Sequence, residues 1–258
     1  MRIKTRIHKA ADRALTIAKI RPRLDPLTSF FIPAEKRECL KKQAKPNTVA
    51  AEFFANKGRP IDKWHHYLDV YERHLSQYKG KPVFFLEIGV FEGGSLDMWR
   101  RYLGDQATIV GIDIDETCAQ RVEAPNIVRI GSQADKEFLQ RIIEEFGQPD
   151  IVLDDGSHIA SHQRASFDVL FKATKEDGLY IIEDLHTSYW APWDGGYRRR
   201  RTAVHFVKQL IDDIHVWYHK RPSSVADGHS VGAVHLYDSI VVIEKEKRER
   251  PGRLTGGG

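Results

Sequence analysis

Short apolar runs and longer amphipathic stretches take turns along the chain from residue 83 onwards. Five of the runs are continuously apolar rather than alternating, and they occupy 83–89, 108–114, 126–131, 149–155 and 178–184. Strands that are buried on both faces have sequences of this kind. Between them, apolar residues recur at helical spacing over 95–103, 135–146 and 161–171. This exchange of strands and helices predicts a parallel sheet covered by helices.

Two further apolar runs follow a long predicted helix at 202–218. They cover 233–238 and 239–245, so close together that they are expected to form a hairpin. Such a hairpin closes the sheet with an antiparallel strand. The predicted fold class is therefore α/β and Rossmann-like, with a mostly parallel seven-stranded sheet that ends in a C-terminal antiparallel hairpin.

The same pattern divides the chain into three regions. Residues 1–60 carry mixed charge and several prolines, and we expect an N-terminal extension that is partly helical. An amphipathic helix at 62–78 opens a domain that covers 61–246. Residues 247–258 are charged and then glycine-rich, which predicts a flexible tail.

Composition places the chain among ordinary globular proteins. Hydrophobic residues make up 41% and charged residues 29% of its 258 positions. The net charge of +4 is too small to indicate a nucleic-acid partner, and no window has the apolar length that a transmembrane segment requires. The basic N-terminus fits a solvated helix or, alternatively, peripheral contact with a membrane surface. Cys39 and Cys118 match no metal or redox spacing, so a cytoplasmic location is expected.

Candidate ligand-binding residues follow the first two strands, because ligands of an open parallel sheet lie beyond the carboxyl ends of its strands. Gly89 and Gly93 permit a tight turn close to a ligand, and Ser95 is placed to cap the next helix. Glu87, just before the turn, would oppose a phosphate but could pair with a cationic group. Asp113, after the second strand, is placed to accept hydrogen bonds from the hydroxyls of a ribose.

The third strand ends in "GSQAD", where Ser132 and Gln133 are placed to face an adenine ring. The dinucleotide fingerprint G-x-G-x-x-G is missing, which disfavours a nicotinamide or flavin dinucleotide. S-adenosylmethionine has a ribose, an adenine, an amino group and a sulfonium, and it carries no phosphate. The residues after the first three strands therefore predict S-adenosyl-L-methionine as cofactor.

In five segments the sequence resembles the metal-dependent sugar O-methyltransferases of macrolide biosynthesis, the mycinamicin and tylosin type. It is similar to the related rhamnosyl O-methyltransferases and the cephalosporin hydroxylase group as well. The segments are "DKWHHYLDVYERH", "LEIGVFEGGSLDMW", "VLDDGSHIASHQ", "IIEDLHTSYW" and "VHLYDSIVVIEK". The resemblance implies a class I methyltransferase fold, a small-molecule glycoside as acceptor, and a homo-oligomer. One departure is that only about 80 residues precede the first strand, and in the enzymes it resembles the N-terminal part helps to shape the acceptor pocket.

The resemblance also implies roles for four residues near the fourth and fifth strands. Asp155, Glu183 and Asp184 correspond to the ligands of a Mg²⁺ ion, and His158 corresponds to the general base. Three carboxylates at the ends of adjacent strands can converge, and such a set favours a hard cation. Histidine gains and loses protons near neutral pH, as a base for an alkyl hydroxyl requires. Asp154 has two open interpretations, a structural residue or a contact to the amino end of the cofactor.

The segment "TSYWAPWDGGYRRRR" at 187–201 has two interpretations. Its aromatic residues fit a lid that stacks on a sugar, or ordinary loop packing. Its arginines fit an anionic acceptor or a solvated helix start. The prediction as a whole is an O-methyltransferase of a sugar on a secondary metabolite or glycoconjugate. The alternatives are methylation of another diol such as a catechol, a hydroxylase-like protein, and a non-catalytic scaffold.

Overall fold

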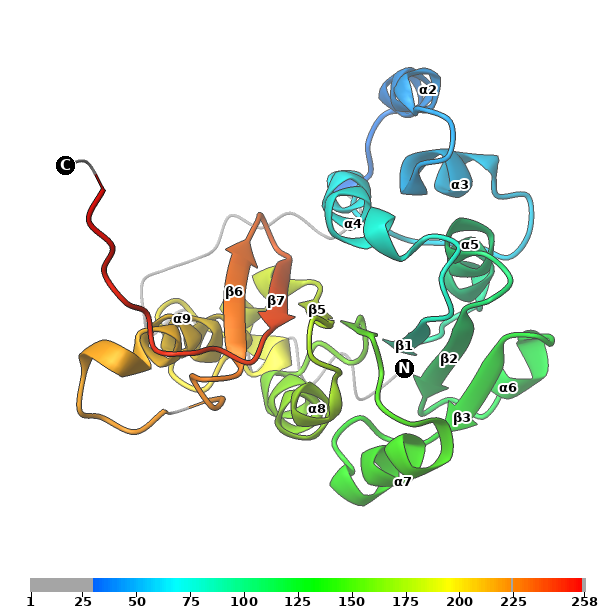
Figure 1. Cartoon of the computed structure of the whole chain (residues 1–258). Coiled ribbons are helices and arrows are strands. Elements are labelled where there is room, and N and C mark those ends of the chain that lie inside the picture. The colour runs from blue at the N-terminus through cyan, green and yellow to red at the C-terminus, as the bar shows by residue number, and fades with distance from the viewer. Residues whose placement is uncertain (1–29, 224, 257–258) are drawn as a thin grey trace, which may run out of the picture.

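The structure, a computed structural model, describes residues 30–223 and 225–256. The described residues form a seven-stranded sheet in the order β3-β2-β1-β4-β5-β7-β6 (Figure 1). Strands β1 to β5 are parallel, and β7 is antiparallel to both β5 and β6. The expected mostly parallel sheet with a C-terminal antiparallel hairpin is confirmed. The strands are β1 Phe84–Ile88, β2 Thr108–Asp113, β3 Ile127–Ile130, β4 Ile151–Asp154, β5 Leu179–Ile182, β6 Val231–Leu236 and β7 Val241–Lys245.

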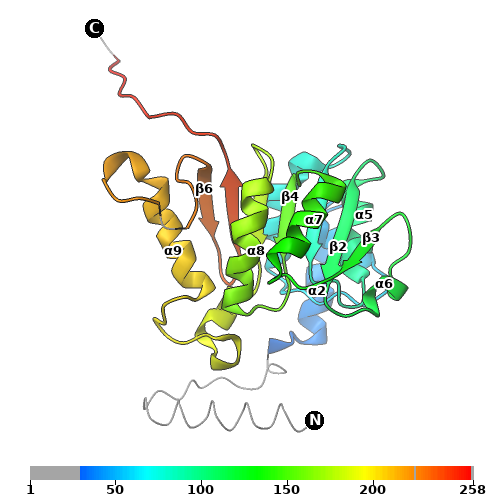
Figure 2. The same ribbon diagram turned by 90° about the horizontal axis from the view of Figure 1, so that it is seen from below.

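Helices cover the sheet on both faces (Figures 1 and 2). One face packs against α3, α4 and α5, and the other against α7, α8 and α9. The longer helices are α2 Ala34–Gln43, α3 Val49–Ala55, α4 Tyr67–Leu75, α5 Gly94–Leu103, α7 Lys136–Phe146, α8 Ala160–Ala173 and α9 Ala203–Ile214. The short ones are α6 Cys118–Arg121 and the 3-10 turns η2 Ser76–Tyr78, η3 Leu185–Tyr189, η4 Ala191–Trp193 and η5 Val216–Tyr218.

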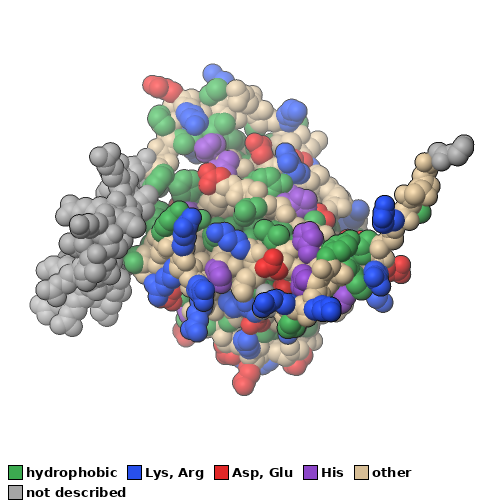
Figure 3. Space-filling view, turned by 90° about the vertical axis from the view of Figure 1, so that its left-hand side faces the viewer, with side chains coloured by type: hydrophobic (Ala, Val, Ile, Leu, Met, Phe, Trp, Pro, Cys, Tyr) green, Lys and Arg blue, Asp and Glu red, His purple; other side chains and the backbone are tan. Residues whose placement is uncertain are grey.

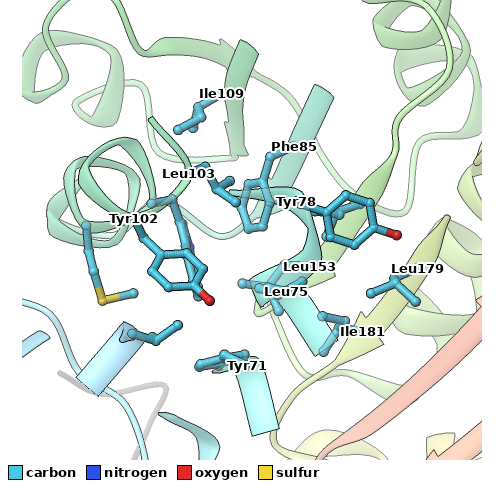
Figure 4. Packing of buried hydrophobic residues seen from close by; sticks show 14 of the residues in the cluster. Tyr71, Leu75, Tyr78, Phe85, Tyr102, Leu103, Ile109, Leu153, Leu179 and Ile181 are labelled. Atoms are coloured by element: carbon cyan, nitrogen blue, oxygen red, sulfur yellow. The ribbon is translucent and has the colours of Figure 1, made fainter. Parts of the chain in front are cut away.

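Successive strand residues serve opposite cores, because side chains alternate across a strand. In β1, Phe85 enters the core under α4 and α5, whereas Phe84 and Leu86 enter the core under α7 and α8. Figure 4 shows the first core, where Tyr71 of α4 lies over side chains of β1, β4 and β5. This two-sided burial explains why the strand sequences are apolar without alternation.

The helix predicted at 62–78 begins later than expected. Residues 61–66 are coil and a turn, α4 starts at Tyr67, and a 3-10 turn ends the segment at Tyr78. The side chain of Lys63 is only 2% exposed and contacts carboxylates at the edge of the sheet. A helical backbone from residue 62 is thus replaced by a segment that delivers this lysine to the interior.

Within the described part of the predicted N-terminal extension, α3 packs on the domain, whereas α2 has no buried residue. Val49 of α3 is fully buried, and its backbone N–H donates to Oε2 of Glu72 in α4 over 2.8 Å. The basic stretch that predicted peripheral membrane contact lies outside the described residues. Among the helices that the structure describes, none is long and apolar enough to cross a membrane.

The C-terminal tail has no regular secondary structure over its described residues, 246–256, but its first part is attached to the domain. The Arg248 guanidinium donates to the carbonyl oxygen of Ile214 over 2.6 Å. Leu254, further on, is fully exposed.

Candidate active site

A cavity of about 520 Å³ opens at the carboxyl ends of the parallel strands. Its wall is made by the residues that follow β1, β2, β3 and β4, together with the segment before α4. These wall segments are Ile88–Glu92, Ile112–Asp115, Gly131–Gln133, Asp155–Ser157 and Pro60–Lys63. The position is the one expected for a ligand of an open α/β sheet. The volume is within the range of small-molecule sites.

The turn after β1 depends on two glycines with left-handed backbones. Gly89 has a φ of 92°, and a β-carbon there would collide with the carbonyl oxygen of Asp155. Gly93 has a φ of 83° and precedes α5, where a β-carbon would meet the side chain of Val122. Both conformations favour glycine. Gly89 lies on the cavity wall, whereas Gly93 does not.

Asp113 lies on the wall, and its carboxylate already binds backbone groups. One oxygen accepts from the N–H of Val90 over 2.8 Å and of Phe91 over 3.2 Å, and the other accepts from Asp115 over 2.9 Å. The side chain thereby fixes the turn after β1 to the end of β2. A carboxylate oxygen accepts more than one hydrogen bond, so the predicted contact to a ribose remains open to it.

Ser132 and Gln133 line the cavity as well. Gln133 is buried and joins two strand ends, because its amide donates to Asp154 over 3.1 Å and its carbonyl oxygen accepts from the N–H of Ser157 over 2.7 Å. Ser95 lies on the wall too, but the prediction that it caps α5 is wrong. It sits inside the helix and its hydroxyl donates to Glu87 over 2.9 Å.

Glu87 and Asp154 lie behind the cavity wall rather than on it, and both are fully buried. Asp154 accepts hydrogen bonds from Ser166 over 2.7 Å and from Tyr180 over 3.3 Å, besides Gln133. Burial raises the pKa of Asp154, which these neutral donors partly offset. Burial also raises the pKa of Glu87 to about 7. The contacts of Asp154 favour the structural interpretation.

Asp155, His158 and Asp184 form a cluster at the rim of the sheet. Their ligating atoms lie within 4.8 Å of one another. Nε2 of His158 is 3.5 Å from Oδ2 of Asp184 and 3.9 Å from Oδ1 of Asp155. Nδ1 of His158 is buried without a hydrogen-bond partner among the described residues. The two carboxylates fit a hard divalent cation, and the imidazole beside them has a nitrogen without a partner among the described residues.

The backbone at this cluster is strained in two places. His158 has a φ of 57° and Asp184 a φ of 55°, both in the left-handed region. Residues other than glycine adopt it at a cost of order 1–3 kcal/mol, and such positions concentrate at functional sites. The strained turn at Asp184 also breaks the alternation after β5, so that Glu183 and Asp184 both contact the α4 side.

Glu183 is linked to Asp155 of this cluster by a cation that sequence reasoning missed. The Lys63 ammonium lies 2.9 Å and 3.1 Å from the two Glu183 oxygens, contacts Asp155, and lies 3.9 Å from Glu87. Burial alone would lower the pKa of Lys63, but the three carboxylates hold it well above its usual range. Burial raises the pKa of Glu183 well above its usual range. The structure thus joins Asp155 and Asp184 with His158, and joins Glu183 with Lys63.

Two tyrosines of α4 complete the site. The Tyr67 hydroxyl donates to Oδ1 of Asp184 over 2.9 Å, and the Tyr71 hydroxyl donates to Glu183. Burial, followed by the adjacent carboxylates, raises the pKa of both phenols. The available sequence signal was the spacing of four residues, which places Tyr67 and Tyr71 on one helix face. That spacing equally indicated ordinary packing.

The aromatic segment after Asp184 lies close to the cluster. Thr187 approaches the backbone oxygen of His158 at 3.4 Å, and the rings of His186 and Trp190 are 4.5 Å apart. Tyr189 and Tyr197 are 47% and 69% exposed, so they are available to an incoming molecule. The lid interpretation stays a prediction.

The strand order, the helices on both faces and the antiparallel β7 define the class I methyltransferase fold. No family model matches the chain. Over 201 residues it is 38% identical to an 8-demethyl-8-(2-methoxy-alpha-L-rhamnosyl)-tetracenomycin-C 3'-O-methyltransferase of Streptomyces olivaceus, with 70% of this chain and 50% of that protein covered. It is 36% identical to the mycinamicin VI 2''-O-methyltransferase of Micromonospora griseorubida, with 74% and 51% covered.

Two solved methyltransferase structures are also similar to this chain. MycE methyltransferase in complex with Mg and SAH matches with a TM-score of 0.68 at 33% identity, over 77% of this chain and 54% of that one. MycE with Mg, SAH and mycinamycin VI matches with a TM-score of 0.70 at 27% identity, over 92% and 68%. The predicted resemblance to macrolide sugar O-methyltransferases is confirmed. The chain spans about half the length of the curated relatives it matches.

Proposed function

We propose that this chain transfers a methyl group from S-adenosylmethionine to a hydroxyl group of a sugar, with the help of Mg²⁺. The observation that carries the proposal is the Asp155–His158–Asp184 cluster beside the cavity at the carboxyl edge of the sheet. Relatives named as sugar O-methyltransferases, and a solved neighbour with Mg and SAH, support it.

The cavity wall is the proposed cofactor site. Gly89 lets the backbone approach the ligand, Asp113 faces the ribose, and Ser132 and Gln133 face the adenine. S-adenosylmethionine would supply an electrophilic methyl group on its sulfonium. Since Glu87 and Asp154 lie behind the wall, we assign them to its support, not to direct contact. Five of the eight predicted cofactor residues line the cavity, namely Gly89, Ser95, Asp113, Ser132 and Gln133.

Asp155 and Asp184 are the proposed acidic ligands of the metal. Three carboxylates, those of Glu87, Asp155 and Glu183, surround the ammonium of Lys63, and a fourth carboxylate, that of Asp184, lies beside Asp155. The excess of negative charge in a partly buried site favours a bound cation. Mg²⁺ would supply Lewis acidity and orient the acceptor hydroxyl. Glu183, a ligand by resemblance, is here held by Lys63 and Tyr71, and we assign it a supporting role.

His158 is the proposed general base. Its ring lies near the carboxylates of Asp155 and Asp184. The side chain is 20% exposed, so an acceptor hydroxyl can approach it. In the proposed step the hydroxyl oxygen forms a bond to the methyl carbon, the carbon–sulfur bond breaks, and the hydroxyl proton moves to the imidazole. Positioning of the two reactants supplies much of the acceleration.

The acceptor is proposed to bind beside the metal ligands and the base. A sugar with vicinal hydroxyls fits a site that holds a cation and a base side by side, and exposed Tyr189 and Tyr197 offer faces for a sugar ring. The homo-oligomer and the cytoplasmic location expected from the sequence belong to the same proposal. Cys39 and Cys118 are both free thiols.

The test is calorimetric titration of S-adenosylmethionine into chelator-treated protein, repeated with Mg²⁺ and then with glycosides and catechols. Cofactor binding, together with glycoside binding that requires Mg²⁺, supports the proposal. Binding of catechols in preference to glycosides would identify a catechol, not a sugar, as the acceptor. An Asp184→Asn variant is the control, because it should keep cofactor binding and lose the Mg²⁺ dependence. Absence of cofactor binding in every condition would overturn the proposal.

A further inference from the structure

A second cluster of ligating side chains lies away from the proposed active site. His74 of α4, His235 of β6 and Glu244 of β7 place their ligating atoms within 4.8 Å of one another. None of the three has a part in the proposed methyl transfer. Two imidazoles and a carboxylate from three different elements therefore converge without an assigned role.

The fold explains why these residues meet. In the β6–β7 ladder, Glu244 lies opposite Ala233, and His235 is two residues further along β6. Positions two apart on a strand share a face, so the two side chains are diagonal neighbours. Val242, on the same face, belongs to the core under α4. This face of the hairpin is therefore the one over which α4 places His74.

The contacts within the cluster are close. Nε2 of His235 lies 2.7 Å from Oε1 of Glu244, and the rings of His74 and His235 are 4.7 Å apart. Nε2 of His74 lies 2.9 Å from the Tyr237 hydroxyl, a fourth polar group beside the same three. The opposing charge is Arg73, whose guanidinium lies 5.7 Å from the centre of the Tyr237 ring.

The chemistry of the three groups favours a borderline metal ion. Two histidines and one glutamate form a known set for Zn²⁺, whereas Mg²⁺ prefers oxygen ligands alone. The neutral imidazole is the form that binds metal. The side chains of His235 and Glu244 are 37% and 41% exposed, which leaves an entry path and room for a water ligand. Histidine side chains are visible on the face of the molecule where β6 is the edge strand (Figure 3).

We propose that His74, His235 and Glu244 bind a divalent transition metal ion, with Zn²⁺ as the preferred ion, and that the ion ties α4 to the C-terminal hairpin. The link has a consequence for the active site. The same helix presents Tyr67 and Tyr71 to Asp184 and Glu183. An ion one helical turn beyond Tyr71 holds that face of α4 in place. The proposal does not depend on methyl transfer.

The experiment measures metal binding and thermal unfolding of the full chain. Chelator-treated protein is kept in excess Mg²⁺, so that the carboxylate-rich site is occupied, and Zn²⁺ alone is added in competition with a colorimetric zinc chelator. His235→Ala and Glu244→Gln remove partly exposed ligands. His219→Ala removes an exposed histidine outside both clusters, and Asp184→Asn alters the carboxylate-rich site.

We expect one tightly bound Zn²⁺ per chain, together with a rise in Tm on zinc addition. Both should be retained in His219→Ala and Asp184→Asn. The affinity should fall by more than about tenfold in His235→Ala and in Glu244→Gln, since loss of a ligand exceeds the usual cost of losing an outer partner. If one of these two variants does not fold, the other carries the test. Equal zinc affinity in wild type and both variants would overturn the proposal, as would a loss confined to Asp184→Asn.

Discussion

Two buried acids at the same edge of the sheet, Asp154 and Glu183, have different hydrogen-bond partners. Asp154, at the end of β4, faces α8 and is held by the neutral donors of Ser166, Gln133 and Tyr180. Glu183, just after β5, faces α4 and is held by the ammonium of Lys63 and the hydroxyl of Tyr71. Both are almost completely buried, and burial raises the pKa of each.

The difference distinguishes an acid with a structural role, on the α8 side, from the acids near the proposed metal site, on the α4 side. On the α8 side one acid is matched by several neutral donors, so that its charge is solvated internally and needs no ion. On the α4 side several acids share a single ammonium, and the excess of negative charge is what a catalytic cation would balance. Asp154 and Asp155, adjacent in "DDGSH", are divided between the two sides, whereas Glu183 and Asp184 of "IIED" both contact the α4 side.

The largest expected effect is a loss of turnover when the proposed base is removed. His158→Ala should lower turnover by about 10²–10⁴-fold, the usual contribution of a general base. Binding of S-adenosylmethionine should stay within a few-fold, because His158 is not on the cavity wall. Steady-state kinetics and calorimetry measure the two effects. His219→Ala is the matched control, and full turnover in His158→Ala would refute the assigned role.

The next effect is a loss of folding stability when the buried cation on the α4 side is removed. Lys63→Met leaves Glu183 and Asp155 without their cation, and loss of one partner of a buried pair costs roughly 3–5 kcal/mol. Urea unfolding measures the change in the free energy of unfolding. Adding Glu183→Gln should restore part of the loss, as a double-mutant cycle will show.

The control for Lys63 is Lys136→Met. Lys136 also pairs with a carboxylate, that of Asp168 at 3.3 Å, but its side chain is 57% exposed. Exposed pairs contribute about 0–1 kcal/mol. Similar losses for the two lysine variants would contradict the view that Lys63 neutralises a buried cluster.

A smaller effect tests the hydrogen bonds from α4. Tyr71→Phe removes the donor to Glu183, and a hydrogen bond to a charged group contributes about 1.5–3 kcal/mol. Thermal and urea unfolding measure the loss. Tyr218→Phe, at a position 71% exposed, should change stability by less than about 0.5 kcal/mol. A neutral result for Tyr71→Phe would mean that Lys63 alone holds Glu183.

The smallest effect is expected on the α8 side. Asp154→Asn keeps the shape of the side chain and one acceptor oxygen, and it removes a buried charge while leaving one donor of Ser166 or Gln133 without its acceptor. These changes oppose each other, so we expect a loss of about 1 kcal/mol. Cofactor affinity and turnover should stay close to wild type. A large loss of cofactor affinity would instead restore the interpretation of Asp154 as a cofactor contact.

Much of this site followed from the order of residues along the chain. The continuous apolar runs predicted the strands, and the position of Asp113, Ser132, Gln133 and Asp155 after strand ends predicted that they gather at one edge. The structure places all four on one cavity wall. This succeeded because parallel strands bring their carboxyl ends to the same edge whatever the details of packing.

The pairing of Lys63 with Glu183 was beyond that reasoning. Lys63 lies in the segment predicted as a helix over 62–78, but the helix in fact begins at Tyr67. The contact joins residues 120 positions apart along the chain, and no local pattern encodes such a pair. Asp184 has a left-handed backbone, and its carboxylate accepts a hydrogen bond from Tyr67, which also contacts the carbonyl oxygen of Ser239. These contacts likewise join segments that are distant along the chain.

The sequence by itself determined the strands, the helices, the edge of the sheet at which ligands gather, and the acids available there. These follow from local periodicity and from the chain direction of parallel strands, both of which are written along the chain. The tertiary structure alone decided that Asp155 and not Asp154 lines the cavity, that Lys63 pairs with Glu183, and that His74 meets His235 and Glu244. Those outcomes depend on which side chains from distant elements lie together in the interior. A charge that is removed from water there is stable only when an opposite charge or a hydrogen-bond partner lies beside it.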